Sequence, residues 1–423
     1  MDRPGREFAE ASDGARLESL RSEETPHQVS PGSARGRRVM HYLGNVGMTG
    51  VETFLLTLCA AQRRRGLEAS IACDLEGRDE LAASCAAIEV EVHPFPLPAP
   101  TSSMRGPARK IASLTLRGKR IRRLAQLMSE TSTQVLHVHA VGVAGLDAFW
   151  AARRVGVPFV VTHHATLEWF EPFRSTLSDF TFWFEKRWAA RVVCPYRAAR
   201  DEMVARGLSQ ERAAVVPFCV DPRKFAQHAV DSPPQGSHFR LFFVARLIEG
   251  KGHRDLLQAV ARLPHLHDKL RVIVLGDGTE RQAIEAEVRR LGLGALVEML
   301  GHVANEKVPA LMRTAHAVVL PSYMPGETFP LSLIEGMTMR LPTIGSRWFG
   351  IPDIVADGET GFIVEPRDVA GLAAAIERLV TSPELARQMG QNGYERALAL
   401  FSDDAVAEAY ERIYDEAALS RLH

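Results

Sequence analysis

The chain has 423 residues, 46% of them hydrophobic, and this length predicts two or three folded domains. Lys+Arg and Asp+Glu both number 51, so the formal net charge is zero. A neutral chain argues against a general nucleic-acid-binding protein, whose domains usually carry a basic excess. The sequence shows no apolar run of membrane-spanning length, no signal-peptide core and no C-x-x-C pair among its five cysteines. We therefore expect a cytoplasmic protein without a disulfide framework or a thiolate zinc site.

Residues 1–36 are polar and aperiodic, and we expect a disordered extension there. Residues 37–220 then alternate apolar strands with helical stretches, which predicts parallel β-α-β units. A loop over Asn45–Gly50 is expected to precede a first helix, Val51–Arg65. The predicted strands of this N-terminal domain are Val39–Leu43, Ala69–Cys73, Val90–His93, Val135–His139, Phe159–Thr162, Val192–Cys194 and Ala213–Val216.

Residues 221–238 are rich in Pro, Gly and Ser and predict a linker. The alternation restarts over residues 239–400, where we also expect helices at Asn305–Thr314 and Pro383–Leu400. Residues 401–423 hold a last helix, Asp403–Ala418, with Ser402 as its candidate N-cap, expected to pack back on the first domain. The predicted strands of the C-terminal domain are Leu241–Ala245, Leu270–Leu275, Val297–Leu300, Ala317–Leu320, Thr343–Ile344 and Gly361–Val364.

The predicted fold class is α/β, with two Rossmann-like, doubly wound parallel-sheet domains facing each other across a cleft. Ligands of open α/β sheets bind beyond the carboxyl ends of the strands. The most informative residues of the sequence lie at two such ends in the second domain.

The segment that follows strand Ala317–Leu320 places Glu327 in a loop and Glu335 inside the next helix. A carboxylate accepts two hydrogen bonds from sugar hydroxyls, and the N–H groups at a helix start suit a phosphate. Two such glutamates alone would usually be solvated surface residues. Arg246 and Lys251, however, follow the first strand of the same sheet, where they can converge on a diphosphate and offset the charge of a leaving nucleotide.

At this point the chain resembles the retaining glycosyltransferases of family 4, which have the GT-B fold. The resemblance covers residues 38–418 and is denser in the second domain. The segments that carry it, in order, are Arg246…Lys251-Gly252, Gly276-Asp277-Gly278, Leu300-Gly301, Pro321-Ser322…Glu327-x7-Glu335-Gly336-Met337, Gly350-Ile351-Pro352-Asp353-Ile354-Val355, Asp357-Gly358 and Thr360-Gly361-Phe362.

The resemblance implies a nucleotide-sugar donor held mainly by the second domain. Arg246 and Lys251 would hold its diphosphate, Glu327 the transferring sugar and Glu335 the ribose. Pro330 stands where many relatives have Gly, and a proline has no N–H to donate. The remaining donor-binding residues implied by the resemblance are Gly276, Phe329, Leu331 and Ser332, together with Pro330.

The first domain resembles the family more weakly. Gly47 and Gly50 fit the family's Gly-rich loop near the phosphate, although a simple turn would also explain them. Thr162-His163-His164 fits a Thr-x-His pattern, which implies that His164 contacts the sugar, although either histidine could simply end a strand. We expect no cofactor and no metal, because the sequence has no D-x-D motif and the two cations can neutralise the diphosphate. Strand alternation accounts for His137-x-His139.

Two stretches bear on partners. Residues 104–127 hold eight basic residues and no acidic one beside an apolar row, typical either of a peripheral membrane helix or of a solvated helix packed on the sheet. Aromatic side chains crowd residues 169–188, where most are expected to be core residues and a few to face an acceptor or lipid.

The sequence therefore predicts a retaining glycosyltransferase that moves a sugar to a hydroxyl of a glycan, a lipid-linked acceptor or a small metabolite. Such acceptors would fit cell-envelope polysaccharide synthesis on the inner face of the membrane. The alternatives are an epimerase or phosphorylase of the same fold, a non-catalytic nucleotide-sugar-binding protein, and a structural protein of the membrane surface.

Overall fold

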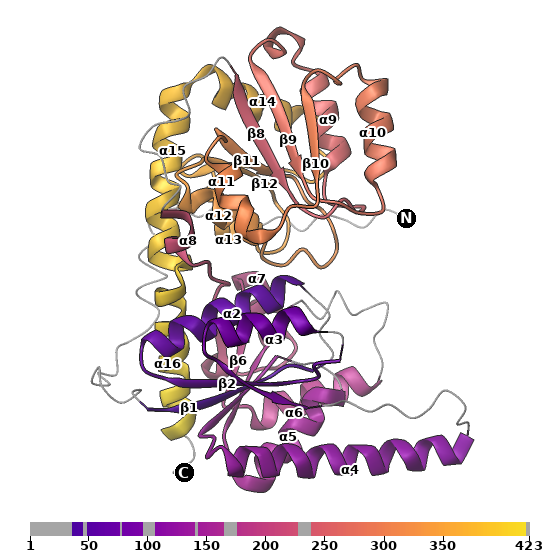
Figure 1. The fold of residues 1–423 in the computed structure, drawn as a ribbon, viewed down its shortest axis with the longest axis vertical. Helices are drawn as coiled ribbons and strands as arrows, with labels where there is room; N and C mark the ends of the chain where they lie inside the picture. Colours follow the sequence, from indigo (N-terminus) through magenta and orange to yellow (C-terminus); the bar gives the residue numbers. More distant parts are fainter. Residues whose placement is uncertain are drawn as a thin grey trace.

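The computed structural model describes residues 36–44, 49–76, 78–95, 106–139, 143–164, 176–226 and 238–419. The predicted extension before Gly36, Gly47 of the predicted loop and most of the predicted linker lie outside these ranges. Within them the chain forms two α/β domains, one above the other in Figure 1, with the C-terminal helices running along both.

The first domain is built on a seven-stranded parallel sheet of order β3-β2-β1-β4-β5-β6-β7, and every predicted strand is present. Its strands are β1 (Arg38–Tyr42), β2 (Glu68–Cys73), β3 (Glu91–Pro94), β4 (Val135–Val138), β5 (Phe159–Thr162), β6 (Arg191–Cys194) and β7 (Ala213–Val215). Its helices are α2 (Thr49–Arg64), α3 (Asp79–Ala87), α4 (Gly106–Glu130), α5 (Val143–Val155), α6 (Thr176–Trp188) and α7 (Arg197–Ala205).

The second domain is built on a six-stranded parallel sheet of order β10-β9-β8-β11-β12-β13, again with every predicted strand present. Its strands are β8 (Phe239–Val244), β9 (Leu270–Leu275), β10 (Val297–Gly301), β11 (Ala317–Leu320), β12 (Thr343–Ser346) and β13 (Gly361–Val364). Its helices are α9 (His253–Ala261), α10 (Arg281–Arg290), α11 (Val308–Met312), α12 (Leu331–Thr338), α13 (Ile351–Ile354), α14 (Val369–Thr381) and α15 (Pro383–Arg396).

The central strands of both sheets are largely buried, as is typical of parallel sheets. Strands such as β4, β5 and β11 are buried at every position, as expected of a sheet covered by helices on both faces. In each sheet the strand order reverses next to its first strand, between β1 and β4 and between β8 and β11. Each domain therefore has a switch point at the carboxyl edge of its sheet, the usual place for a ligand.

Four predicted element boundaries are wrong. Helix α2 begins at Thr49, so Gly50 lies in a helix instead of the predicted loop. The predicted linker contains a short helix, α8 (Pro222–Ala226), which packs on α12. The predicted helix Asn305–Thr314 is instead a 3-10 turn over Asn305–Lys307 followed by the five-residue α11. Helix α15 ends at Arg396 and continues as a π-helical turn over Ala397–Phe401.

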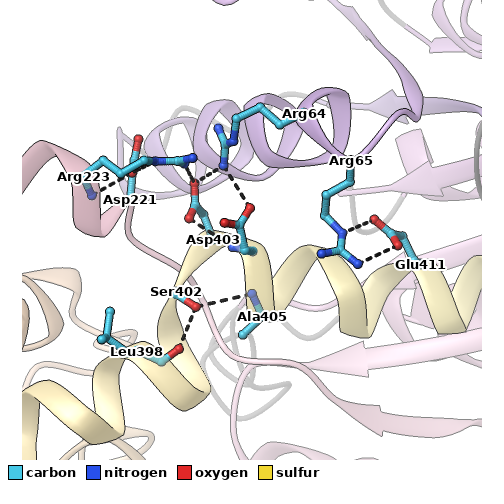
Figure 2. Close-up of polar contacts among 10 residues, drawn as sticks. Arg64, Arg65, Asp221, Arg223, Leu398, Ser402, Asp403, Ala405 and Glu411 are labelled. Carbon is cyan, nitrogen blue, oxygen red and sulfur yellow. Dashed lines mark hydrogen bonds and ion pairs between the residues drawn. The ribbon is translucent and has the colours of Figure 1, made fainter. Parts of the chain in front are cut away.

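The last helix, α16 (Asp403–Leu419), returns to the first domain. Ser402 caps it, because its hydroxyl accepts a hydrogen bond from the N–H of Ala405 at 3.3 Å (Figure 2). Asp403, buried at the start of α16, accepts hydrogen bonds from Arg64 of α2 and Arg223 of α8. Glu411 pairs with Arg65 about two turns further along (Figure 2). These ion pairs fasten the C-terminal helix to α2.

Candidate active site

Two glycines bring the loop after β8 against the loop after β11. Gly250 and Gly252 have φ angles of +84° and +82°. A Cβ on Gly250 would lie 2.8 Å from Cα of Met324, and one on Gly252 would lie 2.3 Å from the carbonyl oxygen of Pro321. The N–H of Tyr323 also donates to the carbonyl of Gly250 at 2.7 Å. The two loops that carry the predicted site residues therefore pack backbone to backbone.

This packing brings Lys251 and Glu327 together. The Lys251 ammonium donates to the Glu327 carboxylate, and each side chain is only 10% exposed. The Glu327 loop is held from the far side, where the Trp348 indole N–H donates to the carbonyl of Met324 at 2.9 Å. Arg246 lies exposed at the end of β8, and its side chain makes no ion pair with any residue that the structure describes. The sequence-predicted cations thus differ: one is paired and buried, the other open to a ligand.

Glu335 lies one turn inside α12, which begins at Leu331. Burial raises the pKa of its carboxyl to about 7, against the opposing effect of the Lys224 charge. Its carboxyl makes no hydrogen bond to any residue within the described ranges. Pro330 is the N-cap of α12, in extended backbone with φ −70° and ψ 115°. The N–H groups of Leu331 and Ser332 are then the first that α12 can offer to a ligand, with Phe329 and Pro330 buried before them.

Gly276 closes the same edge of the sheet from β9. Its φ is +139°, and a Cβ there would lie 1.9 Å from the carbonyl oxygen of Ala245. The adjoining turn meets the loop after β8, because the N–H of Leu247 donates to the carbonyl of Asp277 at 2.9 Å. The loops after β8, β9 and β11 therefore form one unit, which together with the start of α12 carries the predicted donor residues of the second domain.

In the first domain, His164 lies just beyond the carboxyl end of β5 and is buried. Its ring packs near Phe54 and Phe218, with centroid separations of 6.0 and 5.5 Å. Phe218 in turn meets Phe329 of the second domain at 5.8 Å. His164 is therefore two ring contacts away from the start of α12. Gly50 lies in the first turn of α2, and a Cβ there would meet nothing within 4 Å, so no close approach requires a glycine.

A buried histidine cluster is the feature that the sequence reasoning missed. Strand alternation puts His137 and His139 on one face of β4, and the sheet register places His41 of β1 beside His137. His139 bonds His41 at 3.0 Å and His164 at 2.9 Å. The signal available in the sequence was the recurrence of His at three adjacent strand ends. Burial lowers the pKa of all four rings, that of His41 to about 4 and that of His164 to about 3.

Nitrogen atoms of His41, His137 and His139 lie within 4.8 Å of one another, close enough to consider a metal ion. Each ring nitrogen of these three already has a protein partner: Gln62, Tyr414, Thr162, His164 or a second histidine of the cluster. A divalent ion would break at least one of these bonds and would bring its charge into a buried group of neutral rings without a carboxylate. The hydrogen bonds that these ring nitrogens already make therefore fit the three histidines better than a bound metal ion would.

Neighbouring His163 behaves differently. It bonds the buried Glu185 carboxylate at 2.8 Å. Burial lowers the pKa of His163, but the Glu185 charge outweighs it and the net effect is a raised pKa. The pair forms a structural ion pair beneath α6. Of the two adjacent histidines, only His164 faces the Phe218–Phe329 contact.

Helix α4 divides its basic residues between two roles. Arg117 and Arg120 bond the buried Asp147 of α5, so they hold α4 on the domain. Lys119, Arg122 and Arg123 are exposed. Three aromatic side chains on the next two helices, α5 and α6, are also exposed. Trp150 is 41% exposed, Phe180 46% and Trp183 50%. Helices of the described residues are all too short or too polar to cross a membrane.

Comparison with solved structures supports the fold. A glycosyltransferase from Rickettsia africae superposes with a TM-score of 0.73 at 16% identity, covering 90% of this chain and 98% of its own. Anabaena HepE in complex with UDP gives a TM-score of 0.72 at 17% identity, covering 89% and 98%. Both domains and their arrangement are therefore those of GT-B proteins.

Sequence comparison assigns the family. The model described as Glycosyltransferase Family 4 matches residues 48–224, and the model described as Glycosyl transferases group 1 matches residues 226–396. An alpha-D-kanosaminyltransferase of Streptomyces kanamyceticus is 28% identical over 71% of this chain and 81% of its own length. A glycogen synthase of Mycobacterium tuberculosis is 30% identical over 43% of each chain. The chain therefore belongs to the group 1, family 4-type glycosyltransferases with the GT-B fold.

Proposed function

We propose that this glycosyltransferase moves a sugar from a nucleotide-sugar donor to a hydroxyl acceptor with retention of configuration. The observation that carries the proposal is the Lys251–Glu327 pair at the carboxyl edge of the second sheet. Arg246 at the end of β8 is an open cation, and the Glu335 carboxyl in α12 has no hydrogen-bonding partner among the described residues. A diphosphate and a sugar with free hydroxyls are the ligand groups that these side chains would complement.

In the proposed reaction the bond between the anomeric carbon and the diphosphate oxygen breaks while the acceptor oxygen bonds to the same face of that carbon. The proton of the acceptor hydroxyl passes to the departing diphosphate. Arg246 and Lys251 stabilise the negative charge that develops on the leaving group. Glu327 fixes the Lys251 ammonium and binds the sugar. We propose no covalent glycosyl-enzyme, because the sequence places no second carboxylate as a nucleophile.

The names of relatives support this choice. The kanosaminyltransferase and an MMP alpha-(1->4)-mannosyltransferase, 31% identical over 52% of each chain, both form α linkages by name. Transfer from an α-linked nucleotide sugar to an α-linked product is retention. A further HepE structure contains UDP and glucose. The relatives named here are transferases and synthases, which does not favour an epimerase, a phosphorylase or a non-catalytic binding protein.

Titration calorimetry with UDP-, GDP- and ADP-sugars tests the donor. We expect one nucleotide class to bind and its sugar to be transferred, with the anomeric configuration of the product read from proton NMR. Inversion at the anomeric carbon, or cleavage of the donor by phosphate alone, would refute the proposed reaction. We also propose that no metal takes part, so EDTA should leave the rate unchanged; loss of activity that Mg²⁺ restores would contradict this.

We further propose that the first domain contacts an anionic membrane through α4, which would suit a lipid-linked acceptor. The three exposed cations of α4 carry this proposal, at about 1 kcal/mol each near such a surface. Flotation with anionic vesicles at low salt tests it, comparing wild type with the triple variant Lys119→Gln, Arg122→Gln, Arg123→Gln. The matched control removes Arg262, Arg289 and Arg313, which are exposed on the second domain. Equal flotation of the two triple variants would contradict membrane binding by α4.

A further inference from the structure

We infer that His139, His41 and Gln62, buried in the first domain, position His164 in a single tautomer whose Nδ1 accepts a hydrogen bond from a hydroxyl of the transferring sugar. The inference rests on the proposed function, which gives the cleft a sugar to bind. It adds three positioning residues that lie behind His164.

The chain of hydrogen bonds begins at Gln62 of α2. Its amide nitrogen donates to the Tyr414 hydroxyl at 3.2 Å, so its amide oxygen faces Nε2 of His41 at 2.9 Å. A carbonyl oxygen can only accept, and His41 must therefore carry its proton on Nε2. Tyr414 belongs to α16, and its hydroxyl, which accepts from Gln62, can in turn donate its proton to Nδ1 of His137 at 2.7 Å. The C-terminal helix thus fixes which way the Gln62 amide points.

The tautomers of the next two rings follow from that orientation. A neutral imidazole has one N–H and one bare nitrogen. With its proton on Nε2, His41 offers a bare Nδ1, which accepts from Nε2–H of His139 at 3.0 Å. His139 then offers a bare Nδ1, which accepts from Nε2–H of His164 at 2.9 Å. The single ring proton of His164 therefore lies on Nε2 and donates to His139, and Nδ1 of His164 carries no proton.

Neutral rings are what this burial favours. Desolvation lowers the pKa of His41 to about 4 and that of His164 to about 3, and it lowers the pKa of His139 well below its usual value. The His163 charge beside His164 acts in the same direction. At neutral pH none of the three carries a second proton that would disturb the alternation of donors and acceptors.

The last nitrogen in this series of hydrogen bonds, Nδ1 of His164, has no partner among the described residues. This nitrogen is fully buried. A buried acceptor left unpaired is unfavourable, and a bound hydroxyl would supply the missing hydrogen bond. Phe218 links His164 to Phe329 at the start of the donor loop. A sugar hydroxyl, which can donate, is the group that the proposed reaction brings to this place.

Histidine-selective ¹⁵N labelling of the full chain tests the tautomers without any need for turnover. Long-range ¹H–¹⁵N spectra at pH 7 should show His41, His139 and His164 as neutral rings protonated on Nε2, each assigned by its single substitution. A proton on Nδ1 of His164, or a doubly protonated ring, overturns the inference. So does stoichiometric Zn²⁺ binding that displaces the His41 and His139 signals.

One variant and a matched control test the positioning role. Gln62→Leu removes the amide far from the cleft, and we expect His164 to show both tautomers and kcat to fall roughly tenfold to a hundredfold, as is typical when a group that orients a functional histidine is removed. KM should change little. His302→Gln, on an exposed loop of the second domain, is the control. If Gln62→Leu leaves both the His164 tautomer and kcat unchanged, the inference fails; if wild-type protein transfers no sugar but shows the expected tautomers, the proposed function fails instead.

Discussion

At the scale of single residues, the site depends on charges that are buried and paired before any ligand arrives. Lys251 and Glu327 neutralise each other at 10% exposure, whereas Arg246 remains open. A diphosphate would meet one cation that is already fixed and one that is free to adjust. Fixing a cation in advance lowers the reorganisation needed when charge develops on the leaving group.

We expect Lys251→Ala to lower kcat/KM roughly thirtyfold to a thousandfold, because a cation facing the leaving group is lost. This corresponds to about 2–4 kcal/mol of transition-state stabilisation. Glu327→Ala should lower kcat/KM comparably, and should also lower the free energy of unfolding, because it leaves a buried ammonium unpaired. A nucleotide-release assay measures turnover and circular dichroism checks folding. Lys307→Ala is the control, because Lys307 is exposed and makes no ion pair with any residue that the structure describes. A folded Lys251 or Glu327 variant with wild-type turnover would remove that residue from the site.

Glu335 predicts a pH dependence of donor binding. Burial raises the pKa of its carboxyl to about 7, so roughly a tenth is ionised at pH 6 and most at pH 8. Ribose hydroxyls donate to the ionised form and should favour it. The affinity for a nucleotide sugar, whose diphosphate does not titrate in this range, should therefore rise about fivefold to tenfold from pH 6 to pH 8.

Calorimetry in two buffers of different ionisation enthalpy measures the accompanying proton release near pH 6.5. Glu335→Gln should remove both the proton release and the pH dependence. If the variant keeps the wild-type pH profile, another group is responsible and Glu335 does not bind the ribose.

At the scale of elements, sequence patterns predict what is repeated and local. All thirteen strands were predictable from apolar runs of strand length, because both sheets are parallel and buried. The site residues of the second domain were predictable because they follow strands and face one edge. The histidine cluster was not, because it joins β1, β4 and the segment after β5, and only the register of the sheet shows that His41 lies beside His137. The start of α2 at Thr49 was missed because Gly50 is typical of a loop.

The loop unit of the second domain can be tested with two glycines. Gly292 ends α10 with φ +69° and open space around its Cα, so Gly292→Ala should cost about 1–2 kcal/mol of unfolding free energy through backbone strain alone. Gly276→Ala adds a collision with the carbonyl of Ala245 and should cost more than about 3 kcal/mol. Only Gly276→Ala should also weaken donor binding, because it forces apart the loops after β8 and β9.

Denaturant unfolding and calorimetry measure the two effects. Equal losses of stability in both variants, with donor affinity intact, would show that the backbone contact at Gly276 does not shape the site.

At the scale of the whole molecule, three connections set the arrangement of the two domains. Helix α16 returns to the first domain and is fastened by Asp403 and Glu411 (Figure 2). Aromatic rings meet at Phe218 and Phe329. The third is a carboxylate, Asp353 of α13, which accepts the backbone N–H of Arg197 at 2.7 Å and pairs with its guanidinium at 2.9 Å. Asp353 thus caps the N-terminus of α7 from the other domain, a contact that no pattern within either domain could predict.

The Asp353–Arg197 contact leads to a prediction about domain closure. The contact forms only while the domains hold this arrangement, so Asp353→Asn should shift the population toward a more open state. We expect a shift of about 1 kcal/mol, or roughly fivefold in population, because both side chains are partly exposed. The second domain carries the donor residues, so donor affinity should change little. In the proposed reaction, turnover requires His164 from the first domain, so kcat should fall several-fold. Small-angle scattering should show a larger radius of gyration.

Arg197→Gln should change scattering and kcat as Asp353→Asn does, and the double variant should show no further loss of kcat. The control is Asp268→Asn, which is exposed on the second domain and should match wild type. Unchanged scattering and kcat in both single variants would mean that closure does not depend on this pair, and additive losses in the double variant would mean that the two residues act separately.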